Sequence, residues 1–317
     1  MYHKHIPLMT CTLCLLGTGN VFAQANPAKA DAITSENAPP SLTLYLPIAL
    51  DVPGVENPST GVFIPKDYRA GPTVDIVLYL RGYDIKRPKA ATAVREYWGS
   101  PQHPTLKSFL LRDEVNASGK NVILVVPPLG PSSEFGDLKE MKGLHAFLEQ
   151  ILEGLGKHGP HAGLAKPPTL RHLSLAAHSG GGVALRRLAL LLGKNDMYKD
   201  TLKECWGFDS IYGVRDKDAE FWSDWAKEHP GTKITMYYLY TEKDVGKDPT
   251  KPVSATNPAD HKAPSGTSFP AMELDRLAKS MKLNNVIVHR DTKASHNEVP
   301  KTHLANLLKA AEYLEKR

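Results

Sequence analysis

One serine of this 317-residue chain stands where a serine is suited to covalent chemistry. Ser179 follows the apolar run 173–177 and His178, and it precedes three glycines, 180–182. A serine at a tight turn from a strand to a helix is held in a strained backbone conformation that exposes its hydroxyl. The positions two residues before and after must be small, because strand and helix pass close together, and here they are Ala177 and Gly181. The pattern predicts a nucleophilic serine, with the Gly180 amide facing developing negative charge at the helix N-terminus.

Two other interpretations of this turn are a phosphate-binding loop and a purely structural turn. A Walker loop requires Gly-Lys-Ser/Thr, and a dinucleotide fingerprint requires Gly-x-Gly-x-x-Gly after the first strand, and the turn at 178–182 has neither. His158 and His161 do not have a recognisable zinc-ligand spacing, and no His-Glu-x-x-His motif is present. We therefore expect neither a metal ion nor an organic cofactor.

Alternating strands and helices are predicted to position the serine. Short apolar runs typical of buried strands occupy 42–46, 74–80, 122–126, 173–177, 234–240 and 286–288. Helical periodicity appears at 141–155, 183–191 and 304–314. This alternation predicts one α/β domain over residues 42–317, with a mostly parallel sheet and helices on both faces. Ligands in such a domain bind at the carboxyl ends of the strands.

Several of these features together resemble the α/β-hydrolase family over roughly residues 74–300. Beside the serine turn, the strand at 74–80 ends in Arg81-Gly82-Tyr83, where the family often has His-Gly. The resemblance implies that this loop supplies the second oxyanion-hole amide, from Tyr83 or Gly82, next to that of Gly180. The segment Val126-Pro-Pro-Leu-Gly130 resembles the loop that follows the next strand in the family. Ala177, where the family usually has glycine, and Arg81 are departures from the pattern.

The same resemblance implies a catalytic triad in the order serine, acid, histidine. His296 lies between the last predicted strand and the C-terminal helix, where the family keeps its base. Asp244, just after the strand at 234–240, is at the usual position of the acid and is the preferred choice. Asp209 follows the preceding strand and is the alternative acid. Without such roles, Asp244 would belong to a solvated turn and Asp209 would be a buried carboxylate that binds loop amides.

A group of cations begins at the predicted rim of the site. Basic runs of this kind usually form the solvated start of a helix, but here they could also attract an anionic substrate. The cations within fifteen residues are Arg81, Lys86, Arg87, Lys89 and Arg95, against the acids Asp84 and Glu96. We expect Arg81, Lys86 and Arg87, together with His178 beside the serine, to contact the substrate.

The first 25 residues have the layout of a secretory signal peptide. Lys4 is followed by an apolar stretch and then by small residues up to Ala25. We expect cleavage there, a linker at 26–41 and a secreted or periplasmic protein whose one remaining cysteine is Cys205. Cleavage removes one lysine, so the formal charge of +5 becomes +4. This small excess of positive charge does not favour a nucleic-acid partner. No later segment is apolar for 18 residues, so we expect no stable membrane insertion.

These features favour a secreted serine hydrolase that cleaves ester or amide bonds through an acyl-enzyme. The cations at the rim and the predicted export favour an anionic or polymeric substrate, and the chain is similar in these respects to secreted poly(aspartic acid) hydrolases. A general secreted carboxylesterase or polyesterase is the alternative, and a non-catalytic binding protein with the same fold is a third. The sequence leaves the oligomeric state open, a homodimer included.

Overall fold

The computed structural model describes most of the chain after residue 40. The described residues are 41–83 without 49, 53, 54 and 56–58, then 94, 110–212, 217–240 and 267–317. The chain divides into two units, 1–32 and 33–317, and every described residue belongs to the second. The predicted signal peptide, and the predicted linker apart from Ser41, lie outside the described residues.

An eight-stranded sheet runs through this unit, in the order β1-β2-β4-β3-β5-β6-β7-β8. Its strands are β1 Leu42–Leu46, β2 Thr60–Ile64, β3 Thr73–Leu80, β4 Ile123–Val126, β5 Thr169–His178, β6 Leu202–Phe208, β7 Lys233–Leu239 and β8 Val286–Asp291. β2 pairs antiparallel with both β1 and β4, and the pairs from β4 to β8 are parallel. The parallel strands therefore end at one common edge.

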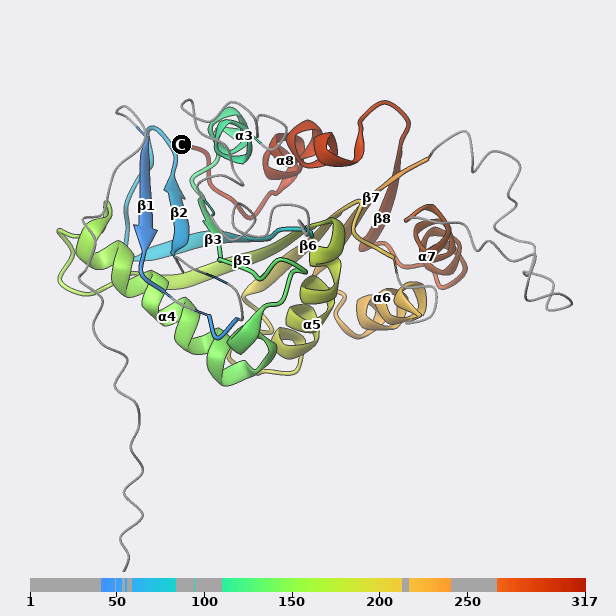
Figure 1. The fold of residues 1–317 in the computed structure, drawn as a ribbon, viewed down its shortest axis with the longest axis horizontal. Coiled ribbons are helices and arrows are strands. Elements are labelled where there is room, and N and C mark those ends of the chain that lie inside the picture. The colour runs from blue at the N-terminus through green and yellow to red at the C-terminus, as the bar shows by residue number, and fades with distance from the viewer. Residues whose placement is uncertain are drawn as a thin grey trace, which may run out of the picture. The chain divides into compact units, whose positions relative to one another are not determined.

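Helices cover both faces of the sheet, as Figure 1 shows. α3 (Leu111–Ser118) and α8 (Val299–Ala310) lie together on one face. The other face carries α4 (Met141–His158), α5 (Gly182–Gly193), α6 (Asp218–Glu228) and α7 (Ser268–Ser280). Three short 3₁₀ helices complete the described elements: η2 (Gly136–Lys139), η3 (Ser179–Gly181) and η5 (His296–Glu298). Among these residues no helix is both long enough and apolar enough to cross a bilayer.

Two hydrophobic cores lie on the two faces of the sheet. The larger joins side chains of α4, α5, α6 and α7 to one face, and the smaller joins α3 and α8 to the other. The central strands are buried on both sides, because alternate side chains such as Leu78 and Tyr79 of β3 enter different cores. Burial on both faces explains why these strands are nearly continuous apolar runs in the sequence.

The strand order and the helices on both faces are those of an α/β-hydrolase fold, so the expected fold class is confirmed. The predicted strand at 42–46 coincides with β1, and the others overlap their counterparts. Two strands, β2 and β6, have no counterpart among the predicted ranges, although a strand is expected before Asp209. The five residues of β2, TGVFI, contain a glycine and only three large apolar side chains, and β6, LKECWGF, contains Lys203, Glu204 and Gly207 among its apolar residues.

Candidate active site

Ser179 lies at the carboxyl end of β5 and begins the η3 turn that leads into α5. Its φ is +52°, in the left-handed region that L residues rarely adopt. The turn is closely packed, because a Cβ on Gly181 would lie 2.4 Å from the Leu80 carbonyl oxygen. A Cβ on Gly182 would lie 1.8 Å from the Ser210 carbonyl oxygen. These contacts are the physical reason for glycines after the serine.

The segment after β3 lies directly against Ser179. A Cβ on Gly82 would be 2.5 Å from the Ser179 Cβ and 3.1 Å from its Oγ, so only glycine fits there. A Cβ on Gly180 would lie 2.3 Å from the Tyr83 ring, which places that ring against the turn. The structure thus brings together Gly82, Tyr83 and Gly180, the three residues expected to provide oxyanion-hole amides.

Arg81 differs from its expected position at the substrate rim. Its side chain is buried, and it donates to the carbonyl oxygens of Gly82 at 2.9 Å, Gly130 at 2.6 Å and Leu129. A guanidinium binds several carbonyls at once because its donors form a planar fork. Arg81 therefore fastens the loop after β4 to the loop after β3, which is a correction to the expected substrate contact.

His178 also has a structural position rather than a substrate-facing one. Its side chain is buried, its Nε2 lies 3.0 Å from the His296 carbonyl oxygen, and its ring lies 4.6 Å from the His296 ring, centre to centre. Burial, with a smaller contribution from His296, lowers the pKa of His178 to about 3. A neutral ring suits this apolar position, because desolvation disfavours the charged form.

His296 and Asp209 form a close pair at the same edge of the sheet. The His296 Nδ1 lies 2.5 Å from the Asp209 Oδ2, and the Asp209 side chain is buried while that of His296 is partly exposed. Asp209 directly follows β6 and has a φ of +49°. His296 begins η5, where a reciprocal capping box between Ser295 and Glu298 fixes the turn. The pair has the geometry in which a carboxylate orients an imidazole.

Two more donors complete the surroundings of Asp209. The Leu239 amide donates to its Oδ1 at 3.1 Å, and the Thr267 hydroxyl donates to the same oxygen. Burial raises the pKa of Asp209, but the hydrogen bonds from His296, Thr267 and Leu239 outweigh it, so the pKa lies below its ordinary value. The carboxylate is therefore ionised at neutral pH.

Thr267 is a site residue that the sequence interpretation missed. It precedes α7, where a threonine usually caps its own helix, but its side chain makes no such bond. Because Thr267 lies 58 positions from Asp209 along the chain, no local pattern connects them.

Three of the predicted site residues lie outside the described part of the chain. They are Asp244, the preferred acid, and the rim cations Lys86 and Arg87. Among the residues that are described, no group of three or more His, Cys, Asp or Glu side chains is arranged to hold a metal ion.

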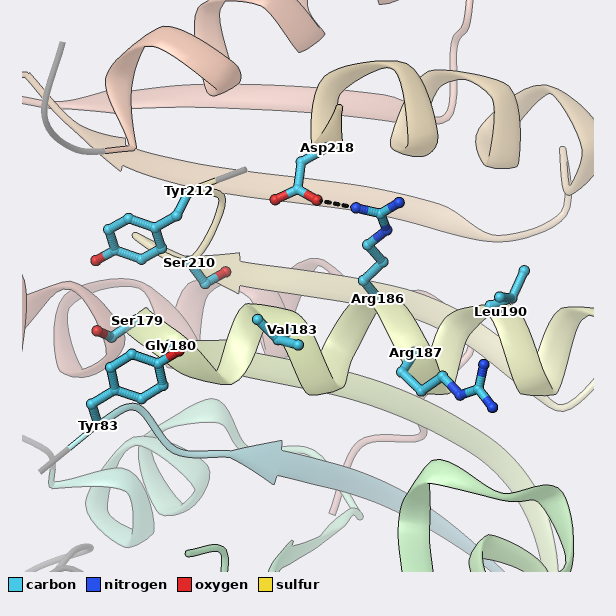
Figure 2. A pocket seen from close by; sticks show the side chains of 10 residues that line it. All are labelled: Tyr83, Ser179, Gly180, Val183, Arg186, Arg187, Leu190, Ser210, Tyr212 and Asp218. Atoms are coloured by element: carbon cyan, nitrogen blue, oxygen red, sulfur yellow. Dashed lines mark hydrogen bonds and ion pairs between the residues drawn. The ribbon is translucent and has the colours of Figure 1, made fainter. Parts of the chain in front are cut away.

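A pocket of about 820 Å³ opens beside Ser179 and extends over α5 (Figure 2). Tyr83 and Tyr212 stand on either side of the serine, and side chains of α5 line the rest together with Ser210 and Asp218. Burial raises the pKa of Tyr212 to about 12, an effect that a hydrogen bond with Ser179 only partly offsets. The phenol therefore keeps its proton at neutral pH and can act as a donor beside the serine.

A scan against protein-family models and a search of curated proteins found no match. Among solved structures, the chain is similar to an S-formylglutathione hydrolase from Agrobacterium tumefaciens, with 11% identity, 88% of this chain and 97% of that chain covered, and a TM-score of 0.48. It is also similar to poly(aspartic acid) hydrolase-1 from Sphingomonas sp. KT-1, with 11% identity, coverage of 79% and 93%, and a TM-score of 0.43. It is similar as well to the siderophore hydrolase EstB from Aspergillus nidulans, with 11% identity, 89% of this chain and 99% of that chain covered, and a TM-score of 0.44. Because these TM-scores are below 0.5, the similarities say nothing about the reaction. The proposed chemistry rests on the residues of this chain alone.

Proposed function

We propose that this protein is a serine hydrolase that cleaves ester or amide bonds, with Ser179 as nucleophile, His296 as general base and Asp209 as the acid that orients the histidine. The observation that carries the proposal is the 2.5 Å contact between His296 Nδ1 and Asp209 Oδ2, at the sheet edge where Ser179 stands at positive φ. Asp209 takes the role for which Asp244 is the preferred choice from the sequence alone.

The reaction follows from these positions. His296 accepts the Ser179 proton on Nε2 while its Nδ1 donates to Asp209, and the serine oxygen attacks the substrate carbonyl. The amides of Gly180 and Tyr83 stabilise the oxyanion, each contributing about 3 kcal/mol to lowering the barrier. His296 then protonates the leaving group, and water activated by the same histidine releases the acyl group from Ser179.

Asp209 must stay ionised throughout this cycle. Its lowered pKa provides this at neutral pH, because three donors stabilise the carboxylate against the cost of its burial. The negative charge stabilises the imidazolium that forms when His296 takes the serine proton.

A hydrolysis panel tests the proposal. Purified protein is assayed on neutral esters, anionic esters and poly-acidic amides, and Ser179→Ala is the paired variant. We expect turnover of at least one class, and a loss of at least about a thousandfold in Ser179→Ala while its circular dichroism stays that of the wild type. Equal turnover by folded wild type and Ser179→Ala would contradict the proposal.

The same panel separates the candidate substrates. An anionic or polymeric substrate, such as poly(aspartic acid), remains our proposal for the natural substrate class, and a general carboxylesterase or polyesterase is the alternative. Preference for the poly-acidic amide supports the first, and activity confined to neutral esters supports the second.

A further inference from the structure

The pocket beside Ser179 follows one face of α5. Val183, Arg187 and Leu190 succeed the serine turn at intervals of three and four residues, the spacing that aligns side chains along a helix. Figure 2 shows these three residues along α5 at increasing distance from Ser179 and Gly180. A bound molecule that reaches the serine can therefore extend along this face of the helix.

The part of this face nearest the serine is apolar and exposed. Val183 is 62% exposed, Tyr83 54% and Tyr212 44%, and all three line the pocket. Among the described residues only two other large hydrophobic side chains, Leu164 and Met197, are exposed to this degree. Apolar side chains gathered at a pocket, rather than scattered over the surface, indicate that an apolar part of a ligand covers them.

Farther along α5 the pocket is lined by two neighbouring arginines with different surroundings. Arg186 forms an ion pair with Asp218 at 2.6 Å and stacks over the Phe221 ring, with its guanidinium carbon 4.4 Å from the ring centre. Arg187 makes a different contact, donating from Nε to the Lys139 carbonyl oxygen at 2.8 Å. Within the described part of the chain, its two terminal nitrogens have no acceptor and no acidic partner.

An arginine that lines a pocket and is held at Nε, with no acceptor for its terminal nitrogens among the described residues, is suited to bind a carboxylate. The contact with Lys139 fixes the orientation of the guanidinium, so less side-chain entropy is lost when an anion binds. Arg187 lies seven positions after Gly180, across the end of η3 and the first turns of α5, which corresponds to about 10 Å along the axis.

We propose that the pocket binds substrates with an apolar segment beside the scissile carbonyl and a carboxylate about 10 Å farther along, held by Arg187. Val183, Tyr83 and Tyr212 contact the apolar segment. This inference rests on the proposed hydrolase function and specifies the substrate class of the same site.

Matched pairs of synthetic esters test the proposal. The acyl series consists of 4-nitrophenyl half-esters of adipic, suberic and sebacic acids, each paired with its neutral methyl ester. The alcohol series carries the same chains on the leaving group of acetate esters, so that either direction of binding is detected. The measured quantity is the ratio of kcat/KM for the anionic ester to that for the neutral ester.

We expect wild type to prefer the anionic ester by about tenfold or more at one chain length, because a hydrogen bond to a charged group is among the stronger ones. Arg187→Gln should abolish this preference, and Arg187→Lys, which keeps the charge, should retain part of it. Lys194→Gln removes the same charge at the end of α5 outside the pocket and is the matched control, so it should keep the preference. Titration of Ser179 with a fluorophosphonate counts the folded active sites in each preparation.

The outcomes separate this inference from the proposed function. Hydrolysis of the neutral esters with no preference for the anionic ones in either series would overturn the role of Arg187 and leave the hydrolase intact. An anionic preference that survives in Arg187→Gln would overturn it as well. If wild type hydrolyses no ester or amide at all, the proposed function itself fails.

Discussion

Ser179 and Asp209 both have positive φ, +52° and +49°, at the ends of the neighbouring strands β5 and β6. Backbone conformations of this kind cost about 1–3 kcal/mol each and persist where the surrounding structure enforces them. The Asp209 amide donates to the Tyr237 carbonyl oxygen at 2.8 Å, which ties this conformation to β7. Seven described non-glycine residues have positive φ, and two of them are proposed catalytic residues; the other five are Asp67, Leu110, Ser133, Lys217 and Lys282.

At the residue scale, two variants distinguish whether Asp209 or Asp244 orients His296. Asp209→Asn should lower kcat by about a thousandfold or more, because an amide no longer stabilises the imidazolium or fixes the tautomer of His296. Asn keeps an oxygen for the Leu239 and Thr267 donors, so we expect the fold to persist. Asp244→Asn is the matched variant and should retain activity. Loss in Asp244→Asn with retention in Asp209→Asn would reverse the assignment.

The buried His178 predicts a pH dependence of stability. Its folded pKa of about 3 lies below that of a histidine in the unfolded chain, about 6.5. As the pH falls through this window, the unfolded chain takes up a proton that the folded protein does not. The free energy of unfolding therefore decreases, by up to about 1.4 kcal/mol per pH unit. The buried His178 therefore lowers the free energy of unfolding below about pH 6.5 and has no such effect above that pH.

Urea unfolding at pH 7 and pH 5 measures this contribution. In His178→Asn the difference between the two pH values should be about 1–2 kcal/mol smaller than in wild type. Asn retains an N–H donor for the His296 carbonyl. The same substitution at the exposed His158 is the matched control. An unchanged difference in His178→Asn would contradict the account.

At the scale of elements, the site depends on how closely the loop after β3 approaches the turn after β5. Gly82 has no space for a side chain against Ser179. The Arg81 guanidinium donates to the carbonyl oxygens of Leu129 and Gly130, which holds the loop after β3 against the loop after β4. These contacts set the distance between the serine and the segment expected to hold the oxyanion.

Gly82→Ala should therefore impair catalysis more than folding. The added methyl would lie 2.5 Å from the Ser179 Cβ, so the loop or the serine must shift, and we expect kcat/KM to fall by about a hundredfold. Gly71→Ala is the matched control, because a Cβ at Gly71 has no neighbour within 4 Å. Kinetics together with thermal denaturation separate the two effects. A fully active Gly82→Ala would show that the loop does not constrain the serine.

Features with a local signature could be predicted from the sequence, and features that depend on distant contacts could not. The run 173–177 and the glycines after Ser179 specify the elbow, because strand burial and helix approach act on neighbouring residues. Thr267 has no such signature, since its role arises from folding against Asp209. Arg81 and His178 were expected at the substrate, but their burial is decided by loops more than 45 residues away in sequence.

At the scale of the whole molecule, parallel strands bring the site together. Tyr83, Ser179, Asp209 and His296 follow β3, β5, β6 and β8, which end at the same edge of one sheet. The two hydrophobic cores hold the sheet between helix layers, so loops far apart in sequence keep a fixed relation. The formal charge of +5 says little about the substrate, because Arg81 is buried and Arg186 is paired, and Arg187 is the cation that we propose to bind substrate.

Covalent labelling of the intact protein tests the central claim most directly. A fluorophosphonate reacts with a serine only when a base and an oxyanion site activate it, so mass spectrometry of the labelled peptide identifies the nucleophile. We predict one adduct, on Ser179, that is absent in Ser179→Ala and strongly reduced in His296→Ala. A folded wild-type protein that does not react, or an adduct on another residue, would contradict the account.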